Sequence, residues 1–358
     1  MTARATAAIA AAALAIAACS RAPARPAETA PATTSGAIAI GNLDHLIAQH
    51  GDEPGIEDLL LTRSRFLADY DALERAAAVA EPRVATAADL VARARTRSAV
   101  HRFADALADL AAAERAGANR DELGALRASI WVATGKAGDA VLGLEAAAAA
   151  HPGFAAASAL AGAYAAVGRF ADADRRYAEA LAALDTSSPF PYAWIYFARG
   201  LMWTEQAHDP ARGEAMYARA VAHLPAFASA NIHLAELEVA RDDLAPALAR
   251  LERVVAATAE PEALALLGSL HVRTGDPVRG GREIAAARQR FEALLARQPL
   301  AFADHAAEFY LGAGADPARA WRLAQQNLAN RATDRAIALE LRAAQATGRY
   351  LIRLLSGS

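Results

Sequence analysis

The sequence predicts an all-α fold built from a repeated pair of helices. Three observations support this prediction: the apolar residues are mostly alanine and leucine, no stretch alternates apolar and polar residues, and one pattern recurs at a fixed interval. Hydrophobic residues make up 55% of the 358-residue chain, but aromatic residues only 6%. Alanine and leucine have high intrinsic helix propensity, and a half-buried strand would show alternation.

The first eighteen residues predict a signal segment. Arg4 is the only charged side chain before Cys19, and an apolar run from Ala5 to Ala18 follows it. A membrane-crossing helix needs about 20 apolar residues, so this run is too short to be one. It is typical instead of the hydrophobic part of a cleaved signal, which we assign to residues 1–18.

Residues 16–19, Ile-Ala-Ala-Cys, resemble the lipobox of bacterial lipoproteins. The resemblance implies cleavage before Cys19 and attachment of acyl chains, such as palmitate, to its sulfur and its new amino group. Several chains, each contributing about 0.8 kcal/mol per buried CH₂, would anchor the protein stably to a membrane. Cys19 is the only cysteine, so the fold cannot depend on a disulfide. The alternative is an ordinary secretory signal with an incidental cysteine.

The residues after Cys19 predict where the protein is anchored and how. In bacteria with two membranes, an aspartate after the acylated cysteine commonly signals inner-membrane retention, so Ser20 favours the outer membrane. The periplasm-facing part then begins with a tether. Residues 20–36 are rich in Pro, Ala, Thr and Ser, a composition that buries too little apolar surface to order itself. We assign residues 19–41 to the acylated cysteine and a disordered tether.

A six-residue pattern recurs along the chain. Residues 135–140, Gly-Lys-Ala-Gly-Asp-Ala, return at 168–173 as Gly-Arg-Phe-Ala-Asp-Ala, a spacing of 33. The pattern resembles the tetratricopeptide repeat (TPR), a helix–turn–helix unit of about 34 residues. The resemblance implies a right-handed α-solenoid of stacked helix–turn–helix repeats. Its concave face would be lined by the first helix of each repeat.

The clearest repeat spans 154–187, with Gly168 at its turn and Ala173, Tyr177 and Ala180 on one face of its second helix. Six other segments match with varying quality: 87–120, 121–153, 194–227, 228–260, 261–296 and 301–333.

The repeat spacing is not uniform. It lengthens near 185–193 and again near 290–300, where the second helix of its repeat is expected to be longer. We therefore divide the array into an N-terminal part, 42–188, and a C-terminal part, 189–358, which ends in a cap. Gly213 and Gly280 replace the alanine expected in a second helix, and we expect them to loosen the packing there.

The TPR resemblance implies that the concave groove holds a protein or peptide segment. Our candidate partner-binding residues occupy predicted groove positions or the aromatic segment 190–203, whose tyrosines and tryptophans are typical interface anchors. The alternative for that segment is the core of an irregular junction. The candidates are Tyr192, Trp194, Ile195, Met202, Glu205, Ile232 and Glu236.

Other classes of function find little support in the sequence. A net charge of −3 gives no basic surface for nucleic acid. GxSxG, GxxxxGK[ST] and strand-associated GxGxxG motifs are absent, so we expect neither catalysis nor a cofactor. His233 and His271 lie on first helices of adjacent repeats, and His305 and Glu308 share a helical face. A metal needs three or four converging ligands, so we expect no metal site.

Together these features predict a non-catalytic, lipid-anchored TPR scaffold. It would bind a protein or peptide partner at the periplasmic face of an envelope membrane, in the manner of repeat-bearing lipoproteins that assist assembly of envelope complexes. The alternative is an envelope protein that binds a solute or handles a metal. A third, weaker hypothesis is a cell-wall enzyme built on a helical superhelix.

Overall fold

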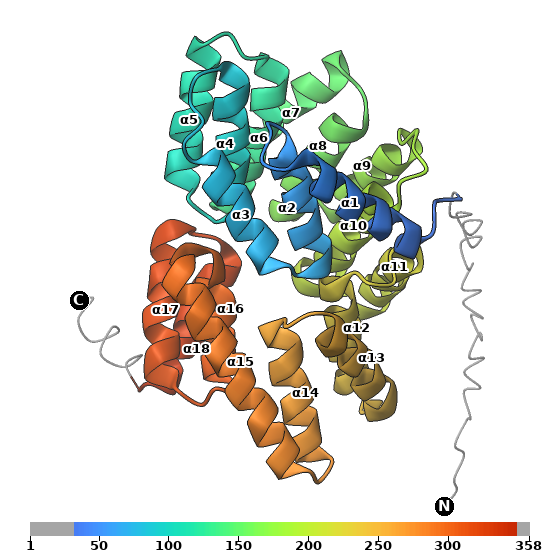
Figure 1. The fold of residues 1–358 in the computed structure, drawn as a ribbon, viewed down its shortest axis with the longest axis vertical. Helices are drawn as coiled ribbons and strands as arrows, with labels where there is room; N and C mark the ends of the chain where they lie inside the picture. The colour runs from blue at the N-terminus through green and yellow to red at the C-terminus, as the bar shows by residue number, and fades with distance from the viewer. Residues whose placement is uncertain (1–31, 349–358) are drawn as a thin grey trace, which may run out of the picture. The chain divides into compact units, whose positions relative to one another are not determined.

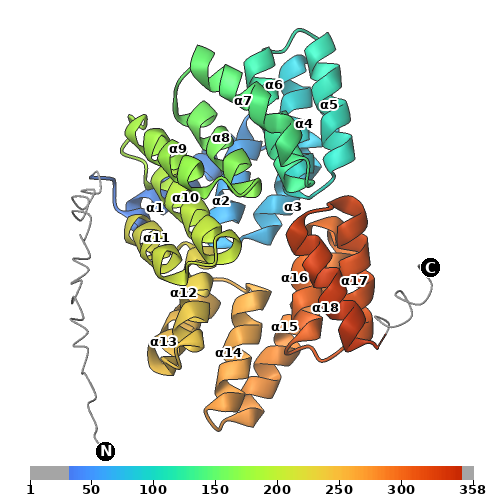
Figure 2. The same cartoon turned by 180° about the vertical axis from the view of Figure 1, so that it is seen from behind.

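The computed structural model describes residues 32–348, and every regular element in that range is helical. The element order is shown in Figure 1 and, from behind, in Figure 2. A π-helical turn, η1 (Met202–Gln206), follows α10. The α-helices are α1 Gly36–His50, α2 Ile56–Leu67, α3 Tyr70–Ala80, α4 Ala87–Ala99, α5 Phe103–Arg115, α6 Arg120–Ala133, α7 Ala137–Ala150, α8 Phe154–Ala166, α9 Phe170–Ala182, α10 Pro189–Leu201, α11 Pro210–His223, α12 Ala228–Ala240, α13 Leu244–Ala257, α14 Pro261–Arg273, α15 Pro277–Arg297, α16 Pro299–Leu311, α17 Pro317–Asn330 and α18 Asp334–Ala346.

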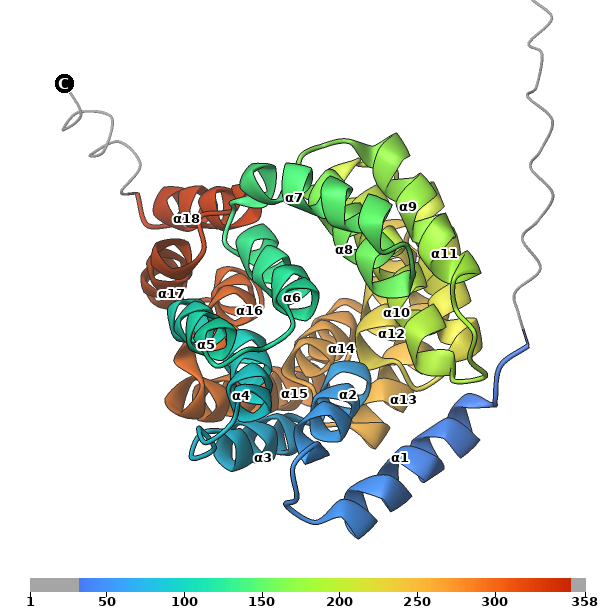
Figure 3. The same ribbon diagram turned by 90° about the horizontal axis from the view of Figure 1, so that it is seen from above.

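The helices from α2 to α17 pair into eight successive hairpins, each even-numbered helix packing against the odd-numbered helix that follows it. Stacking of these hairpins confirms the predicted all-α, TPR-like solenoid. Seen from above, helices such as α6, α8, α14 and α16 face inward, whereas α7, α9 and α17 lie outside them (Figure 3). We call the inward surface formed by the first helices of the hairpins the inner face.

The recurring glycine ends the first helix of a hairpin. Gly135 and Gly168 have φ values of 83° and 77°, a left-handed conformation that glycine adopts without a Cβ penalty. Each is followed by the same backbone bond: Lys136 N donates to Trp131 O at 2.7 Å, and Arg169 N donates to Tyr164 O at 2.8 Å. This arrangement supplies hydrogen-bond donors to carbonyl groups that have no partner within the helix at its C-terminal end. The 33-residue spacing is therefore the distance between two copies of this glycine turn.

The small residues of the second helices are buried, as the repeat predicts. Ala173 and Ala180 are fully buried, with Tyr177 between them. Gly213 and Gly280, however, do the opposite of what we expected. A Cβ on Gly213 would overlap Thr204 Oγ1, and one on Gly280 would overlap the carbonyl oxygen of Gly268. These glycines bring paired helices closer together than alanine allows, so they tighten the packing rather than loosen it.

The first helix begins inside the segment that we assigned to the tether. The helix α1 starts at Gly36, where Ser35 Oγ accepts a hydrogen bond from Ile38 N at 3.4 Å. Gly36 lies directly against Leu224 and Pro225. The end of the predicted tether is thus helical because it is capped and packed. Residues 19–31, including Cys19, lie outside the described residues, as does the predicted signal segment.

Residues 33–348 belong to one compact unit. The helices pack across the predicted boundary at 188/189: Arg199 Nη2 of α10 lies 2.8 Å from Asp174 Oδ1 of α9. The lengthened spacing before this boundary corresponds to the connection between α9 and α10. The lengthening near 290–300 corresponds to α15, which has 21 residues where α13 and α17 have 14 each.

Helices from the two ends of the array meet along a contact that we call the seam. Leu73 of α3 and Val100, at the end of α4, share an apolar cluster with Phe291 of α15 and Phe302 of α16. The Tyr70 and Phe302 rings meet edge to face, with centroids 4.9 Å apart. Burial of each large apolar side chain contributes about 1.5–3 kcal/mol, so Leu73 and Val100 add to an apolar cluster that belongs mostly to α15–α18.

Polar contacts reinforce the seam. Asn330 Nδ2 donates to the carbonyl oxygen of His101 at 3.0 Å, and His101 Nδ1 lies 3.1 Å from the carbonyl oxygen of Leu300. Arg297 Nη1 of α15 lies 2.7 Å from Glu74 Oε2 of α3. The array therefore turns far enough for its first hairpins to pack against its last ones.

Candidate functional site

Four of the seven predicted partner-binding residues are core residues. Tyr192, Ile195, Met202 and Ile232 are at most 4% exposed, so a partner cannot touch their side chains in this arrangement. The inferred groove register placed Ile195, Met202 and Ile232 at the surface, but α10 and α12 are packed on more than one side by neighbouring helices. The burial of Tyr192 agrees with the alternative for the aromatic segment, the core of a junction. The other three, Trp194, Glu205 and Glu236, are accessible and remain candidates: Trp194 is partly buried, and both glutamates are exposed.

The π-helical turn η1 extends the aromatic helix α10. Ala207 N donates to Met202 O at 2.9 Å, five residues back, in place of the usual four. Such turns are rare and often occur at functional sites. Here a second hydrogen bond, from Asp209 N to Trp203 O at 2.7 Å, spans six residues and follows the turn. Glu205 lies in this turn, with its Oε2 3.8 Å from Arg335 Nη1 of the last helix, α18.

Charged side chains from five elements, η1 and every second helix from α12 to α18, come together near Glu205 on the inner face. His233 Nδ1 lies 2.9 Å from Glu236 Oε2, and His305 pairs with Glu262. We call this group the inner charge cluster: Glu205 of η1, His233 and Glu236 of α12, Glu262 of α14, His305 of α16 and Arg335 of α18. Its members keep between 23% and 53% of their side chains exposed. Water, and therefore a ligand, can reach them.

His305 is the most strongly perturbed member of the cluster. The carboxylates of Asp304 and Glu262 raise the pKa of His305 to about 10, so this side chain is cationic at neutral pH. Burial opposes ionisation of Asp304, but the charges of His305 and Arg331 outweigh it and lower the pKa of Asp304 to about 2. The cluster is thus a set of fixed, opposite charges rather than a neutral hydrogen-bonded network.

A buried acid lies beside the cluster. Burial, together with the negative charge of Glu262, raises the pKa of Glu260 to about 8. Glu260 Oε2 accepts a hydrogen bond from Ala263 N at 2.6 Å, which caps α14, and Glu260 Oε1 lies 3.3 Å from the Tyr70 hydroxyl of α3. This carboxyl group therefore joins the inner face to the seam and is mostly protonated at neutral pH.

An aromatic residue and a cation meet on the inner face. The guanidinium group of Arg65, on α2, lies 4.7 Å from the centre of the Trp194 ring on α10. Burial lowers the pKa of Arg65, yet its side chain is exposed in part. Stacking of this kind leaves the edge N–H groups of the guanidinium directed away from the ring. Sequence reasoning had selected Trp194 but not Arg65, because they are 129 residues apart in the sequence (194 − 65).

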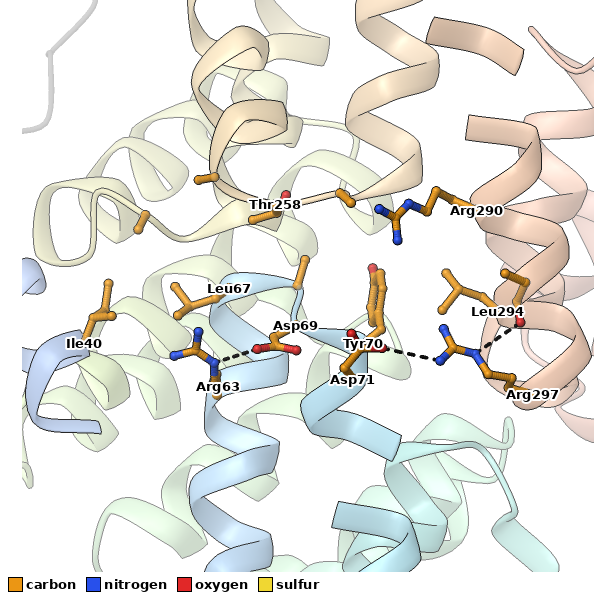
Figure 4. Close-up of a pocket in the computed structure, with 15 residues that line it drawn as sticks. Ile40, Arg63, Leu67, Asp69, Tyr70, Asp71, Thr258, Arg290, Leu294 and Arg297 are labelled. Carbon is orange, nitrogen blue, oxygen red and sulfur yellow. Dashed lines mark hydrogen bonds and ion pairs between the residues drawn. The ribbon is translucent and has the colours of Figure 1, made fainter. Parts of the chain in front are cut away.

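The seam contains a cavity of about 450 Å³. We call it the seam cavity, and Figure 4 shows the side chains that line it. Its walls come from α1, the α2–α3 turn, the α13–α14 connection and the last turns of α15. A second cavity, also about 450 Å³, shares Arg297 and continues along the seam past Pro299 and Asn330. Sequence reasoning missed both cavities. The one indication was the second helix that ends near residue 297, which is longer than the second helices of the other repeats.

The histidines considered as metal ligands are paired with carboxylates. His271 Nδ1 lies 2.5 Å from Glu283 Oε2. His305 faces Glu262, whereas Glu308 pairs with Arg342 instead. In residues 32–348 no three His, Cys, Asp or Glu side chains are grouped in a way that could hold a metal ion.

Within residues 32–348, none of the helices from α1 to α18 combines the length and apolarity required to cross a bilayer.

Comparison of the chain with known proteins found similar solved structures but no matching family profile or curated sequence. The structure of the APC/C hetero-tetramer Cut9–Hcn1 is 16% identical, with a TM-score of 0.47 over 87% of this chain and 67% of that one. A tetratricopeptide repeat protein from Parabacteroides merdae is 15% identical, with a TM-score of 0.42 over 72% and 98%. The human IFIT1 dimer with PPP-AAAA is 14% identical, with a TM-score of 0.42 over 90% and 85%. These likenesses concern the fold alone.

Proposed function

We propose that this protein is a non-catalytic, lipid-anchored scaffold that binds a segment of a partner protein on its inner face. The observation that carries the proposal is the inner charge cluster, in which side chains from five elements along the array converge and stay accessible to water. A solenoid stacks its repeats to present such an extended surface. Polar side chains of both signs, with an aromatic anchor nearby, suit a charged peptide segment.

The accessible candidates suggest how the partner would be held. Trp194 offers a flat apolar surface under the Arg65 guanidinium, which suits an acidic or aromatic side chain. Glu236 is about half exposed and pairs with His233 on its own helix, so its carboxylate can exchange that partner for a basic side chain. Charges of this kind set the orientation and specificity of a bound segment more than its affinity.

Site-specific photocrosslinking tests the partner-binding proposal. A photoreactive phenylalanine analogue replaces Glu236 on the inner face or, as a control, Leu142 of the outer helix α7, which is 78% exposed. After irradiation in living cells, we expect one discrete protein adduct from position 236 and none from position 142. Combining the probe at Glu236 with Trp194→Ala should reduce that adduct at least several-fold.

Two results would contradict partner binding on the inner face. One is equal crosslinking from positions 236 and 142, which would indicate collisions rather than a specific surface. The other is an adduct at position 236 that the Trp194→Ala substitution leaves unchanged. Circular dichroism of each variant verifies that the helical fold is retained.

We further propose that the scaffold acts at the periplasmic face of an envelope membrane, in assembly of an envelope complex, with Cys19 as its lipid attachment point. The support is the lipobox-like sequence of residues 16–19, with Ser20 favouring the outer membrane. We expect radiolabelled palmitate to be incorporated into the wild-type chain and not into Cys19→Ala. Labelling that persists in Cys19→Ala would contradict acylation at this residue. Membrane fractionation of the wild-type chain then tests the outer-membrane assignment.

A further inference from the structure

The extra length of α15 builds one wall of the seam cavity. In a helix of 14 residues, the length of α13 and α17, α15 would end at about Arg290. The cavity is lined instead by Arg290, Ala293, Leu294 and Arg297, which lie at spacings of three, four and seven and so share one helical face. The departure from the repeat length therefore supplies a continuous wall that a regular hairpin would lack.

The opposite wall comes from the start of the array. Leu67, Asp69 and Tyr70 line the cavity around the α2–α3 turn, and Ile40 contributes from α1. The alanines of the α13–α14 connection, Ala257 and Ala259, line it as well. Leucine, isoleucine and alanine side chains thus form an apolar lining beside the charged groups. A cavity of about 450 Å³ with this mixture falls within the usual size range of small-ligand sites.

The three arginines of the cavity differ in how they are paired. Three arginines and two aspartates line it. Asp69 Oδ2 lies 2.6 Å from Arg63 Nε, and Asp69 Oδ1 accepts from Ala72 N at 2.9 Å. Asp71 Oδ1 is 3.4 Å from Arg297 Nη1. Arg63 and Arg297 also pair with Asp44 and Glu74, so both arginines are engaged by carboxylates.

Arg290 is the cavity arginine without a carboxylate partner in the described part of the chain, and it is exposed to solvent. Among residues 32–348, no side chain forms a hydrogen bond or an ion pair with it. Figure 4 shows its guanidinium directed from α15 toward the space between Thr258 and Tyr70. The nearby Glu260 does not supply a counter-charge, since its oxygens face the Tyr70 hydroxyl and the first turn of α14.

We propose that the seam cavity binds a small amphiphilic anion, with its carboxylate or phosphate on Arg290 and its short apolar body against Leu67 and Leu294. A guanidinium pairs with either anion through two parallel N–H bonds. The ligand would contact both ends of the array at once and would bind only while the seam is intact. Binding would therefore also stabilise the seam. This proposal does not depend on partner binding at the inner face.

Isothermal titration calorimetry on the purified full chain tests the proposal. The probes are octanoate and octyl phosphate, with octan-1-ol and inorganic phosphate as their neutral and purely anionic counterparts. We expect at least one amphiphilic anion to bind with a stoichiometry of one. Octan-1-ol and inorganic phosphate should each bind at least about ten-fold more weakly, because each lacks one half of the interaction. Whichever anion binds better identifies the headgroup.

Substitutions locate the binding. Arg290→Gln should weaken the amphiphilic anion at least about ten-fold, whereas Arg282→Gln, at an exposed position on the same helix, should leave affinity unchanged. Ala293→Phe, also at an exposed position, should fill the cavity and abolish binding. The ligand should raise the melting temperature of the wild-type chain and not that of Arg290→Gln.

Three outcomes would overturn the proposal. They are failure of both amphiphilic anions to bind, affinity for octan-1-ol or inorganic phosphate equal to that for the amphiphiles, and wild-type affinity in Arg290→Gln.

Discussion

At the scale of single residues, close approach between helices depends on two glycines in positions where the repeat normally has alanine. A Cβ on Gly280 would meet the backbone of the facing helix, the carbonyl oxygen of Gly268 and the amide nitrogen of Val272. Backbone atoms cannot rotate away as a flexible side chain can. The absence of a side chain here is a packing requirement, although glycine lowers helix propensity by about 0.5–1 kcal/mol.

This requirement predicts opposite effects at two adjacent positions of α15. Gly280→Ala should lower the free energy of unfolding by about 1–3 kcal/mol, since the extra methyl forces the helices apart. Gly281→Ala has nothing within 4 Å of the added Cβ, and should raise the free energy of unfolding by about 0.5–1 kcal/mol through helix propensity. Urea denaturation followed by circular dichroism measures both. Equal stability of the two variants would show that Gly280 tolerates a side chain.

At the scale of elements, the sequence predicts what is local. The hairpin formed by α8 and α9, Phe154–Ala182, lies inside the predicted repeat 154–187 because apolar spacing and a turn glycine are properties of neighbouring residues. The choice of groove-facing residues failed for Ile195 and Ile232 because it depended on how neighbouring hairpins rotate against one another. That rotation is decided by packing at the whole interface, which helical periodicity does not report.

The seam is the part that local patterns could not predict. His101 meets Leu300 across 199 positions and Asn330 across 229, and no repeat spacing encodes such contacts. Arg290 and Tyr70 likewise line one cavity only because α15 and α3 are brought together in the fold. The one local signal was the length of α15, which showed that this hairpin differs from the others without showing what the added turns contact.

The extension of α15 should therefore control the stability of α3, more than 200 residues away. Leu294 is buried in the cluster that also contains Leu73 of α3, so Leu294→Ala should cost about 2–5 kcal/mol and increase hydrogen exchange throughout Tyr70–Ala80. Leu160→Ala, a matched truncation in the separate cluster around α8, should increase exchange in α8 and α9 instead. Exchange mass spectrometry distinguishes these patterns. If both variants expose α3 equally, the extension has no special part in holding the seam.

At the scale of the whole molecule, two groups near the meeting point of the inner face and the seam make stability depend on pH. The folded protein raises the pKa of Glu260 from its ordinary 4.5 to about 8, through burial and the charge of Glu262. It raises the pKa of His305 from 6.5 to about 10, through Asp304 and Glu262. In both cases the folded state binds a proton that the unfolded state has already released, so stability falls as pH rises through these windows.

The contribution of Glu260 is fully present below about pH 4.5 and lost as pH rises through 8, whereas that of His305 is fully present below about 6.5 and lost as pH rises through 10. We therefore expect the melting temperature to fall steadily between pH 6 and pH 10. Glu260→Gln keeps a neutral side chain that can still accept from Ala263 N and cannot ionise. It should lose much less stability than the wild type between pH 6 and 8, and the two should fall in parallel from pH 8 to 10 while His305 titrates. Thermal unfolding followed by circular dichroism measures the melting temperature of both proteins across this range. The melting temperature of the wild type could instead be independent of pH, or Glu260→Gln could reproduce it at every pH. Either result would mean that the protonated carboxyl group between α14 and α3 does not help to hold the two ends of the array together.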